Sequence, residues 1–371
     1  MRLKVYIQNI VNIERNKRIF CNQDKKFTRR MSYHTGGLPE LTQKQAKMAR
    51  SFFAEYGFKI TTVFHRFVTG ITNQFSPIYI HPGLFYTCIE PALNDMRLAQ
   101  AYGDKNVYEK FFPNERFPQT VARCISGSFY DDAYRYISYE KFVELIKKEK
   151  AVAVKPAIDS GGGNCVKVIS KDDDVNREIG PYIKEGDFII QCVAKQHDEM
   201  NAFNQTSLNI VRLISLYLDG EVIIPITALR VGAPGAFNDN YIDEKDRSML
   251  TIGLNPTTGK ICSDAFFASG EKSATCLNGF DYHNKEIPSF QEMLDIARRL
   301  HPQLPHLKMV SWDFYVDAEG HASIMELNTH GQGIAYYQYT NGPLFRDEKL
   351  TRRILDEVVK TSKRTNSVER A

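Results

Sequence analysis

The spacing of apolar and polar residues changes character near Pro118. Before it, residues 41–56 and 90–102 show helical spacing of apolar side chains, and a turn-rich stretch at 77–83 separates them. After it, short apolar runs alternate with clearly bounded helices. Six runs are predicted to be strands: 151–154, 188–193, 210–218, 222–229, 309–316 and 322–327. Strands and helices mixed in this way, with neighbouring runs spaced as hairpins, predict an α+β fold.

Two helices in the second part of the chain have recognisable starts. Ser138 can cap the helix that follows it, in which apolar side chains share one face. Ser289 and Glu292 have the spacing of a capping box, and from Met293 onward apolar residues fall at helical positions. These patterns predict helices that begin directly after Ser138 and Ser289.

Composition limits the class of protein. The chain of 371 residues is 43% hydrophobic and 25% charged, as in ordinary globular proteins. It has no run that approaches the ~20 apolar residues of a membrane span, and its first 13 residues do not read as a signal peptide. Seven cysteines without a C-x-x-C pair argue against a disulfide framework and a structural zinc site. They favour the reducing cytoplasm.

The net charge of +4 hides an uneven distribution. Residues 1–30 contain nine Lys or Arg against two acids, a net of +7, which leaves −3 for the rest of the chain. A basic arm of this kind can contact anionic lipid headgroups or nucleic acid. A solvated surface segment is the simpler interpretation.

A phosphate-binding pattern occurs at 151–169. An apolar run ends at Lys155, a loop with three glycines follows at 160–164, and a second apolar run follows the loop. Glycines let backbone N–H groups approach an anion closely, and Lys155 adds a positive charge beside them. The spacing matches neither a Walker A motif nor a dinucleotide fingerprint, so a plain glycine-rich hairpin stays open as the alternative.

A second pattern, at 310–328, predicts a hairpin. Residues 317–320 have the composition of a turn between two apolar runs. If the turn is centred between Glu319 and Gly320, a symmetric count places Asp313 directly opposite Glu326.

This hairpin is a candidate metal site. Side chains alternate along a strand, so Glu326 and Asn328 should share one face, with Met325 and Leu327 on the other. Asp313, Glu326 and Asn328 would then form a cluster of hard oxygen ligands that suits Mg²⁺. An acidic surface hairpin is the alternative, and the surrounding apolar residues argue against it.

Three further features are less specific. The run at 188–193 opens into polar residues at 194–199, an arrangement that could hold an adenine and a ribose, although a plain core strand is the simpler interpretation. Arg212 and Arg230 each interrupt an apolar strand. An inward-facing arginine needs an anion, which could be a phosphate or the carboxylate of a structural ion pair.

In this order the motifs resemble the ATP-grasp superfamily, and most closely the sugar-transfer-associated ATP-grasp proteins of bacterial surface-polysaccharide gene clusters. The resemblance extends from about residue 100 to about residue 360. The matching pieces are Asp104-Lys105-Asn106, the Pro118-flanked strand, the segment from Arg123 to Asp131, Lys155 with its loop, 207–212, 229–232, 237–240, Trp312-Asp313 and Glu326-Leu327-Asn328. Position 123 departs from many superfamily members, because it is Arg where they have Lys.

The resemblance implies two α+β subdomains that grip ATP, preceded by a mainly helical N-terminal region. We expect that region at 1–115, the subdomains at 116–195 and 196–362, and a flexible tail at 363–371. The implied ATP contacts are Arg123, Lys155, the loop residues Ser160, Gly161, Gly162, Gly163 and Asn164, and the adenine-binding residues Gln191, Cys192 and Val193. The ribose contact stays open among His197, Asp198 and Glu199.

The resemblance also implies the chemistry. Two magnesium ions, with manganese as an alternative, would be held by Asp313, Glu326 and Asn328, and Arg212 and Arg230 would face the transferred phosphoryl group or an acyl phosphate. The expected enzyme is an ADP-forming carboxylate–amine ligase that joins an amino acid or other amine to a uronic-acid-type carboxylate in polysaccharide biosynthesis. A sugar kinase and a non-catalytic nucleotide-binding accessory protein are the alternatives.

Partners and location follow from the same resemblance. We expect small-molecule or sugar-linked substrates, no nucleic acid, a cytoplasmic location, and a weak peripheral association of the basic arm with membrane-bound polysaccharide machinery. His330, next to the expected metal strand, is either a substrate contact or a structural residue. The oligomeric state is left open.

Overall fold

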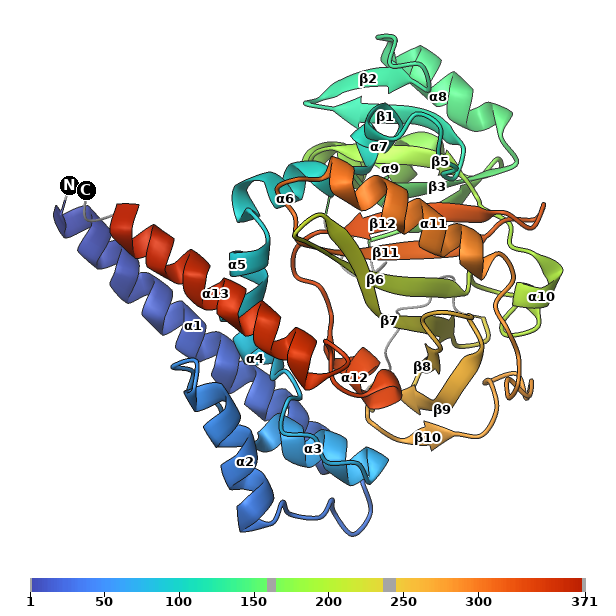
Figure 1. Ribbon diagram of the computed structural model, residues 1–371. Coiled ribbons are helices and arrows are strands. Elements are labelled where there is room, and N and C mark those ends of the chain that lie inside the picture. The colour runs from blue at the N-terminus through green and yellow to red at the C-terminus, as the bar shows by residue number, and fades with distance from the viewer. Residues whose placement is uncertain (1, 159–164, 236–244, 369–371) are drawn as a thin grey trace.

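Figure 1 shows the computed structural model, which describes residues 2–158, 165–235 and 245–368, with side chains from residue 14 to residue 361. Helices form the first part of the chain, and two antiparallel sheets with flanking helices form the rest. The predicted α+β class is confirmed. Within the described residues, no helix has the length and apolar character that crossing a membrane requires.

The first part of the chain is helical, as predicted. Its elements are α1 (Arg2–Met31), α2 (Gln43–Ala54), α3 (Val63–Thr72), α4 (Pro82–Leu84), the π-helix η1 (Phe85–Ile89), α5 (Glu90–Leu93), α6 (Met96–Tyr102), the 3-10 helix η2 (Lys105–Val107) and α7 (Tyr108–Phe111). A capping box starts α2: Gln45 N donates to Thr42 Oγ1 at 3.2 Å, and Thr42 N donates to Gln45 Oε1 at 2.9 Å.

The helical pattern at 90–102 forms two helices rather than one. Asn94 has an extended backbone, and its Nδ2 donates to the carbonyl oxygens of Met309 at 2.8 Å and Thr329 at 2.7 Å. Asp95 then caps α6 through its side chain. Hydrogen bonds to distant strands therefore interrupt a segment whose spacing alone predicts a continuous helix.

The smaller sheet has five strands in the order β2-β1-β5-β3-β4, all paired antiparallel. Its strands and helices are β1 (Thr120–Ile125), β2 (Ser128–Asp131), α8 (Tyr139–Lys148), β3 (Ala151–Pro156), β4 (Lys167–Ser170), α9 (Val175–Glu185) and β5 (Phe188–Cys192). Phe142 of α8 and Ile179 of α9 pack with Phe188 of β5 in one core. Ser138 caps α8, as predicted.

The larger sheet has seven strands in the order β10-β9-β8-β7-β6-β11-β12, also antiparallel. The elements of this part of the chain are α10 (Asp198–Asn201), β6 (Ile210–Leu218), β7 (Glu221–Gly232), β8 (Met249–Leu254), β9 (Ile261–Phe267), β10 (Lys272–Ser273), α11 (Phe290–Leu300), the 3-10 helix η3 (His301–Gln303), β11 (Met309–Val316), β12 (Ala322–Asn328), α12 (Ala335–Asn341) and α13 (Glu348–Val368). All six runs predicted as strands form strands.

Helices cover both faces of the larger sheet (Figure 1). On one face, Met293 of α11 packs in a core with Trp312 of β11. On the other face, Phe85 of η1 and Leu355 of α13 pack in a core with Ile214 of β6. The helical N-terminal region therefore shares a core with the sheet, so it helps to fix the strands that carry the site.

α11 begins directly after Ser289, as predicted, but the contacts at its first turn differ from the prediction. Ser289 adopts a left-handed backbone, and its hydroxyl donates to the carbonyl oxygen of Gly320. Glu292 accepts from Ala322 N at 2.7 Å and makes no capping bond to Ser289. The predicted capping box is therefore wrong. Both side chains instead connect α11 to the β11–β12 hairpin.

Candidate active site

A cleft with a volume of about 490 Å³ lies where the two sheets meet. Residues of β3 and β5 line it from the smaller sheet, residues of β6, β11 and β12 line it from the larger sheet, and η2 contributes one side chain. Volumes of about 300–1,000 Å³ are typical of small-molecule sites. Its charged lining residues include Lys105, Lys155, Asp198, Asp313 and Glu326.

Asp313 on β11 pairs with Glu326 on β12, as predicted. The pairing does not come from a symmetric count of residues on either side of the turn, however, because one strand contains an extra residue. Toward the turn, Phe314 pairs with Ile324, so regular pairing would place Asp313 opposite Met325. A β-bulge at this point adds one residue to β12 and places Glu326 there instead. Met325 consequently lines the cleft together with Glu326, and the prediction that it lies on the opposite face is wrong.

Asp313 is buried and bound by two arginines. Arg212 contacts it through two nitrogens, Nε to Oδ1 and Nη2 to Oδ2, the second at 2.7 Å. Arg230 Nη1 lies 3.5 Å from Oδ2, and Asn328 Nδ2 donates to the same oxygen at 3.2 Å. The ion pair that the sequence left open as an alternative for these arginines is therefore present.

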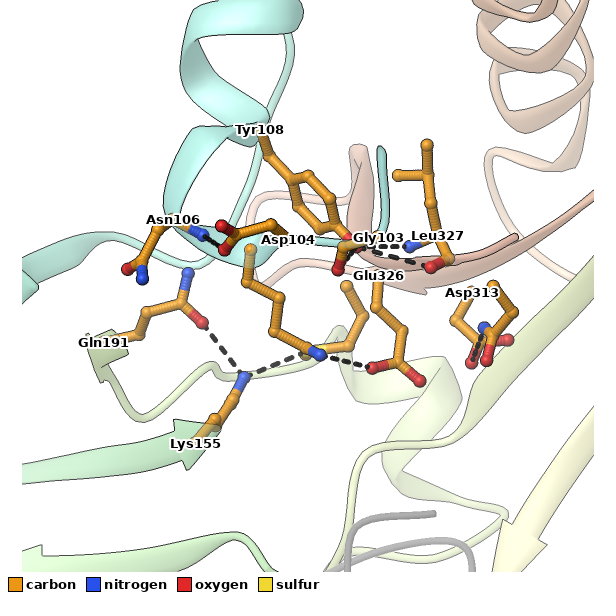
Figure 2. A network of polar contacts seen from close by, with 12 residues as sticks. Gly103, Asp104, Asn106, Tyr108, Lys155, Gln191, Asp313, Glu326 and Leu327 are labelled. Atoms are coloured by element: carbon orange, nitrogen blue, oxygen red, sulfur yellow. Dashed lines mark hydrogen bonds and ion pairs between the residues drawn. The ribbon is translucent and has the colours of Figure 1, made fainter. Parts of the chain in front are cut away.

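Glu326 is bound by a different cation, because Lys105 Nζ lies 3.2 Å from its Oε2 (Figure 2). Burial alone would raise the pKa of Glu326, but the positive charges of Lys105, Arg212 and Arg230 outweigh burial and hold that pKa well below its usual range. The carboxylate is therefore ionised throughout the physiological pH range.

Backbone contacts fix Lys105 between the two sheets. Its N–H donates to the carbonyl oxygen of Ala157, which follows β3. Tyr108, one turn further on, accepts from Leu327 N at 3.0 Å and donates to the carbonyl oxygen of Gly103 at 3.0 Å (Figure 2). The segment 103–108 is thereby held against β12 and aims the Lys105 side chain into the cleft.

Lys155 at the end of β3 points into the same cleft. Its Nζ donates to Gln191 Oε1 at 3.1 Å and lies 3.2 Å from Met325 Sδ (Figure 2). Burial and the nearby charge of Lys105 lower the pKa of Lys155 to about 8, although Glu326 opposes the change. A buried ammonium with neutral and sulfur partners remains available to bind an anion.

Arg123 is placed differently from the other predicted phosphate contacts. Its side chain is fully buried, pairs with Glu109, and donates Nη1 to the carbonyl oxygens of Asp131 at 3.1 Å and Asp132 at 2.8 Å. Its guanidinium also lies 4.0 Å from the ring centroid of Tyr134. Arg123 is absent from the described residues that line the cleft, so its observed contacts are structural.

The remaining predicted residues divide into two groups. Cys192, Val193 and Asp198 line the cleft, whereas Gln191 supports it by donating Nε2 to the carbonyl oxygen of Pro118 at 3.1 Å and holding Lys155. His197 accepts from Glu199 N at 3.4 Å as the cap of α10, and neither of these residues is among the described lining residues.

Some predicted residues do not enter the described cleft. His330 follows β12 but is not a described lining residue. Asn328, Arg212 and Arg230 are not described lining residues either, and each contacts the cleft residue Asp313. The loop Ser160 to Asn164 and the segment 237–240 lie outside the described residues.

Reasoning from the sequence gave no site role to several residues that line the cleft, among them Lys105 and Met325. The pattern that could have identified Lys105 is the Asp104-Lys105-Asn106 motif, which supports the family resemblance. Met325 enters through the bulge, which the sequence does not reveal.

The carboxylates and the amide form a small donor set. Among the described residues, no three His, Cys, Asp or Glu side chains form a group that could hold a metal by themselves. Asp313, Glu326 and Asn328 together offer two carboxylates and one amide oxygen. This composition suits a metal that completes its coordination with phosphate oxygens and water, as Mg²⁺ does in nucleotide sites.

Comparisons with known proteins found a family and solved structures to which this chain is similar. The family described as sugar-transfer associated ATP-grasp matches residues 85–353. No curated protein matches the chain. Solved structures with a similar fold include the ATP-grasp ligase PsnB complexed with minimal precursor (13% identity, 71% of this chain, 64% of that chain, TM-score 0.42) and the VanG D-Ala:D-Ser ligase from Enterococcus faecalis (13% identity, 71% of this chain, 63% of that chain, TM-score 0.42). The matched part thus spans less than two thirds of each of these proteins.

Proposed function

Because this chain belongs to the sugar-transfer associated ATP-grasp family, we propose that it is an ATP-dependent carboxylate–amine ligase that works through an acyl phosphate. The observation that carries the proposal is the convergence of Lys105 and Lys155 with Asp313 and Glu326 on one cleft. Phosphoryl transfer needs cations that bind phosphate oxygens and carboxylates that bind the accompanying metal, and this cleft offers both.

ATP would lie along the cleft from β5 toward β12. Its adenine would contact Cys192 and Val193, and its ribose would contact Asp198, because Asp198 lines the cleft whereas His197 and Glu199 are not among the described lining residues. Its phosphates would face Lys155 and Lys105, which both line the cleft. This placement adds Lys105 to the phosphate contacts that the sequence predicts.

Asp313, Glu326 and Asn328 are the residues that would hold magnesium. Asp313 and Glu326 lie opposite each other on β11 and β12 and both line the cleft, which supports this assignment. When bound, Mg²⁺ would neutralise the negative charge that develops on the phosphate oxygens during transfer. We propose two ions, with Mn²⁺ as a substitute.

The arginines would act on the transferred group. Arg212 and Arg230 now bind a carboxylate, and a phosphoryl oxygen is an acceptor of the same kind. Guanidinium groups placed beside the γ-phosphoryl group stabilise its charge in the transition state. We therefore assign both arginines to the acceptor side of the reaction.

The reaction requires no covalent bond to the protein. An oxygen of the acceptor carboxylate attacks the γ-phosphorus of ATP, the bond to the bridging oxygen breaks, and ADP leaves. The nitrogen of the amine then attacks the acyl carbon, the bond from that carbon to the phosphate oxygen breaks, and inorganic phosphate leaves while the nitrogen loses a proton. Lys155, Arg212 and Arg230 bind and orient the charged groups throughout.

The family description favours a substrate that contains a sugar. We propose a uronic-acid-type carboxylate and an amino acid or other amine, joined during polysaccharide biosynthesis. The site would operate in the cytoplasm, with the basic arm in weak contact with membrane-bound polysaccharide machinery.

The experiment that tests this function is hydroxylamine trapping. The protein is incubated with Mg-ATP, candidate uronic acids and hydroxylamine, and hydroxamate and ADP are measured together. The proposal predicts both products in equal amounts, their loss in Glu326→Gln, and their retention in Glu319→Gln, which removes an exposed carboxylate from the turn of the same hairpin. ADP with a phosphorylated sugar and no hydroxamate would establish the kinase instead.

A further inference from the structure

The helical region that precedes the family match contains a cavity of its own. The match begins at residue 85, and a cavity with a volume of about 560 Å³ lies among α1, α2 and α3, which all precede that residue. In Figure 1 these helices lie apart from the smaller sheet and from strands β11 and β12, whose residues line the cleft between the sheets. The proposed ligase reaction therefore assigns no role to this cavity.

The lining of the cavity is strongly basic. Lys47 and Arg50 enter it from α2 and Arg66 enters it from α3, against a single acid, Glu40. The four charges sum to +2. Hydroxyl groups add donors through Thr28 of α1, Ser51 of α2 and Thr62, which precedes α3.

These three cationic side chains have few ion-pair and hydrogen-bond partners among the described residues. Arg66 Nη1 lies 2.7 Å from Glu40 Oε1 and its Nη2 donates to the carbonyl oxygen of Leu38 at 2.9 Å, whereas its buried Nε has no hydrogen-bond partner among the described residues. Arg50 Nη2 donates to Thr62 Oγ1 over a long 3.4 Å. Lys47 has neither an ion pair nor a hydrogen bond with the described part of the chain.

Helix orientation adds to the positive charge. The first turns of α2 and α3 both contribute lining residues, Gln43 and Ala46 from one helix and Val63 from the other. Thr62 makes no side-chain capping bond to α3, so the first N–H groups of that helix depend on other partners. The N-terminal end of a helix carries partial positive charge and favours anions.

We propose that this cavity binds the phosphate group of a ligand that is distinct from ATP. A phosphate monoester carries a charge of about −1.5 to −2 near pH 7, which balances the net charge of +2 in the lining. A carboxylate carries a single negative charge and would leave part of that positive charge uncompensated. Guanidinium groups match phosphate oxygens in a bidentate geometry, and Lys47 provides an additional point charge. The phosphate can belong to a free phosphorylated metabolite or to the headgroup of an anionic lipid.

Titration with inorganic phosphate tests the site in the full-length protein. Amide NMR shifts of α2 and α3 are followed, because they report on this cavity whether or not the cleft binds nucleotide. We expect saturable shifts at the first turns of both helices. The double variant Lys47→Gln/Arg50→Gln should weaken binding by about ten-fold or more, whereas Lys44→Gln/Lys59→Gln, which removes two exposed charges outside the lining, should change it less than about two-fold. Absent shifts, or equal losses in both variants, would overturn the proposal.

Vesicle sedimentation distinguishes the two sources of phosphate. Vesicles of phosphatidylcholine with phosphatidylglycerol are compared with vesicles of phosphatidylcholine alone. Sedimentation that requires phosphatidylglycerol, is competed by free phosphate and is lost in Lys47→Gln/Arg50→Gln supports a lipid headgroup. Phosphate-dependent NMR shifts without such sedimentation support a soluble metabolite.

Discussion

Asp313 and Glu326 lie directly opposite each other on neighbouring strands, yet each carboxylate is bound by different cations. Arg212 and Arg230 bind Asp313, whereas Lys105 binds Glu326. The two sets come from different parts of the molecule, because the arginines lie on β6 and β7 and the lysine precedes the smaller sheet. The charge of the cleft therefore depends on how the two sheets and the N-terminal helices are held together.

The pair formed by Glu326 and Lys105 should contribute to stability. Lys105 is 6% exposed, so Glu326→Gln leaves a buried ammonium without its partner and is expected to destabilise the protein by about 2 kcal/mol. Adding Lys105→Met should recover part of that loss. Urea unfolding of both single variants and the double variant measures the coupling, and strictly additive effects would contradict it.

Lys105 and Arg123 should have separable roles. Lys105→Met is expected to weaken Mg-ADP binding by about ten-fold or more, because Lys105 lines the cleft. Arg123→Met should change that affinity less than about two-fold but lower the free energy of unfolding by about 3 kcal/mol, because Glu109 loses its buried partner. Calorimetric titration and urea unfolding check both. A large loss of affinity in a stable Arg123→Met protein would restore Arg123 as a phosphate contact.

Nucleotide binding should weaken in alkaline solution. Burial, aided by Lys105, lowers the pKa of Lys155 to about 8, so the ammonium loses its proton as the pH rises through that value. The affinity for Mg-ADP should therefore be constant below about pH 7.5 and fall by up to about ten-fold per pH unit above about pH 8. Titrations across this range measure it, with Lys155→Arg as the variant that should remove the inflection. An affinity that rises with pH would contradict the assignment.

Glu90 should make stability depend on pH. Burial raises the pKa of Glu90 from 4.5 to about 7, against the N–H groups of Gln332 and Gly331 that lower it. Between pH 4.5 and about pH 7 the folded protein keeps a proton on Glu90 that the unfolded chain has released. The contribution of Glu90 to the free energy of unfolding therefore falls as the pH rises, by about 3 kcal/mol in total. Chemical unfolding at about pH 5 and about pH 8 should show a smaller decline for Glu90→Gln than for the parent protein. An identical decline would contradict this account.

Local patterns in the sequence predict the strands and the pairing of Asp313 with Glu326. Residues 210–218 and 309–316 form strands with the predicted bounds, because long apolar runs bury both faces of a central strand. β9 was not predicted, because its alternating burial and polar residues weaken the pattern. The bulge beside Met325 and the break at Asn94 depend on neighbours distant in sequence, so no local pattern reveals them.

Part of the candidate site was also predictable, because some of its residues can be identified from the local sequence alone. The residue types at 155, 313 and 326 indicate phosphate and metal chemistry wherever the chain places them. Whether a cation such as Arg123 or Lys105 reaches the cleft depends on packing between segments, and the structure places Lys105 there. The anion-binding cavity among α1, α2 and α3 is likewise a property of helix packing.

The central claim is that a carboxylate oxygen of the substrate attacks the γ-phosphorus of ATP. The measurement that tests it most directly uses a substrate whose carboxylate is labelled with ¹⁸O, with mass spectrometry of the phosphate released during turnover with Mg-ATP and the amine. The account predicts that each released phosphate carries a single ¹⁸O atom, because the bridging oxygen of the acyl phosphate comes from the substrate and leaves with phosphorus. Released phosphate without ¹⁸O, or a phosphorylated sugar that retains all of the label in its carboxylate, would contradict it.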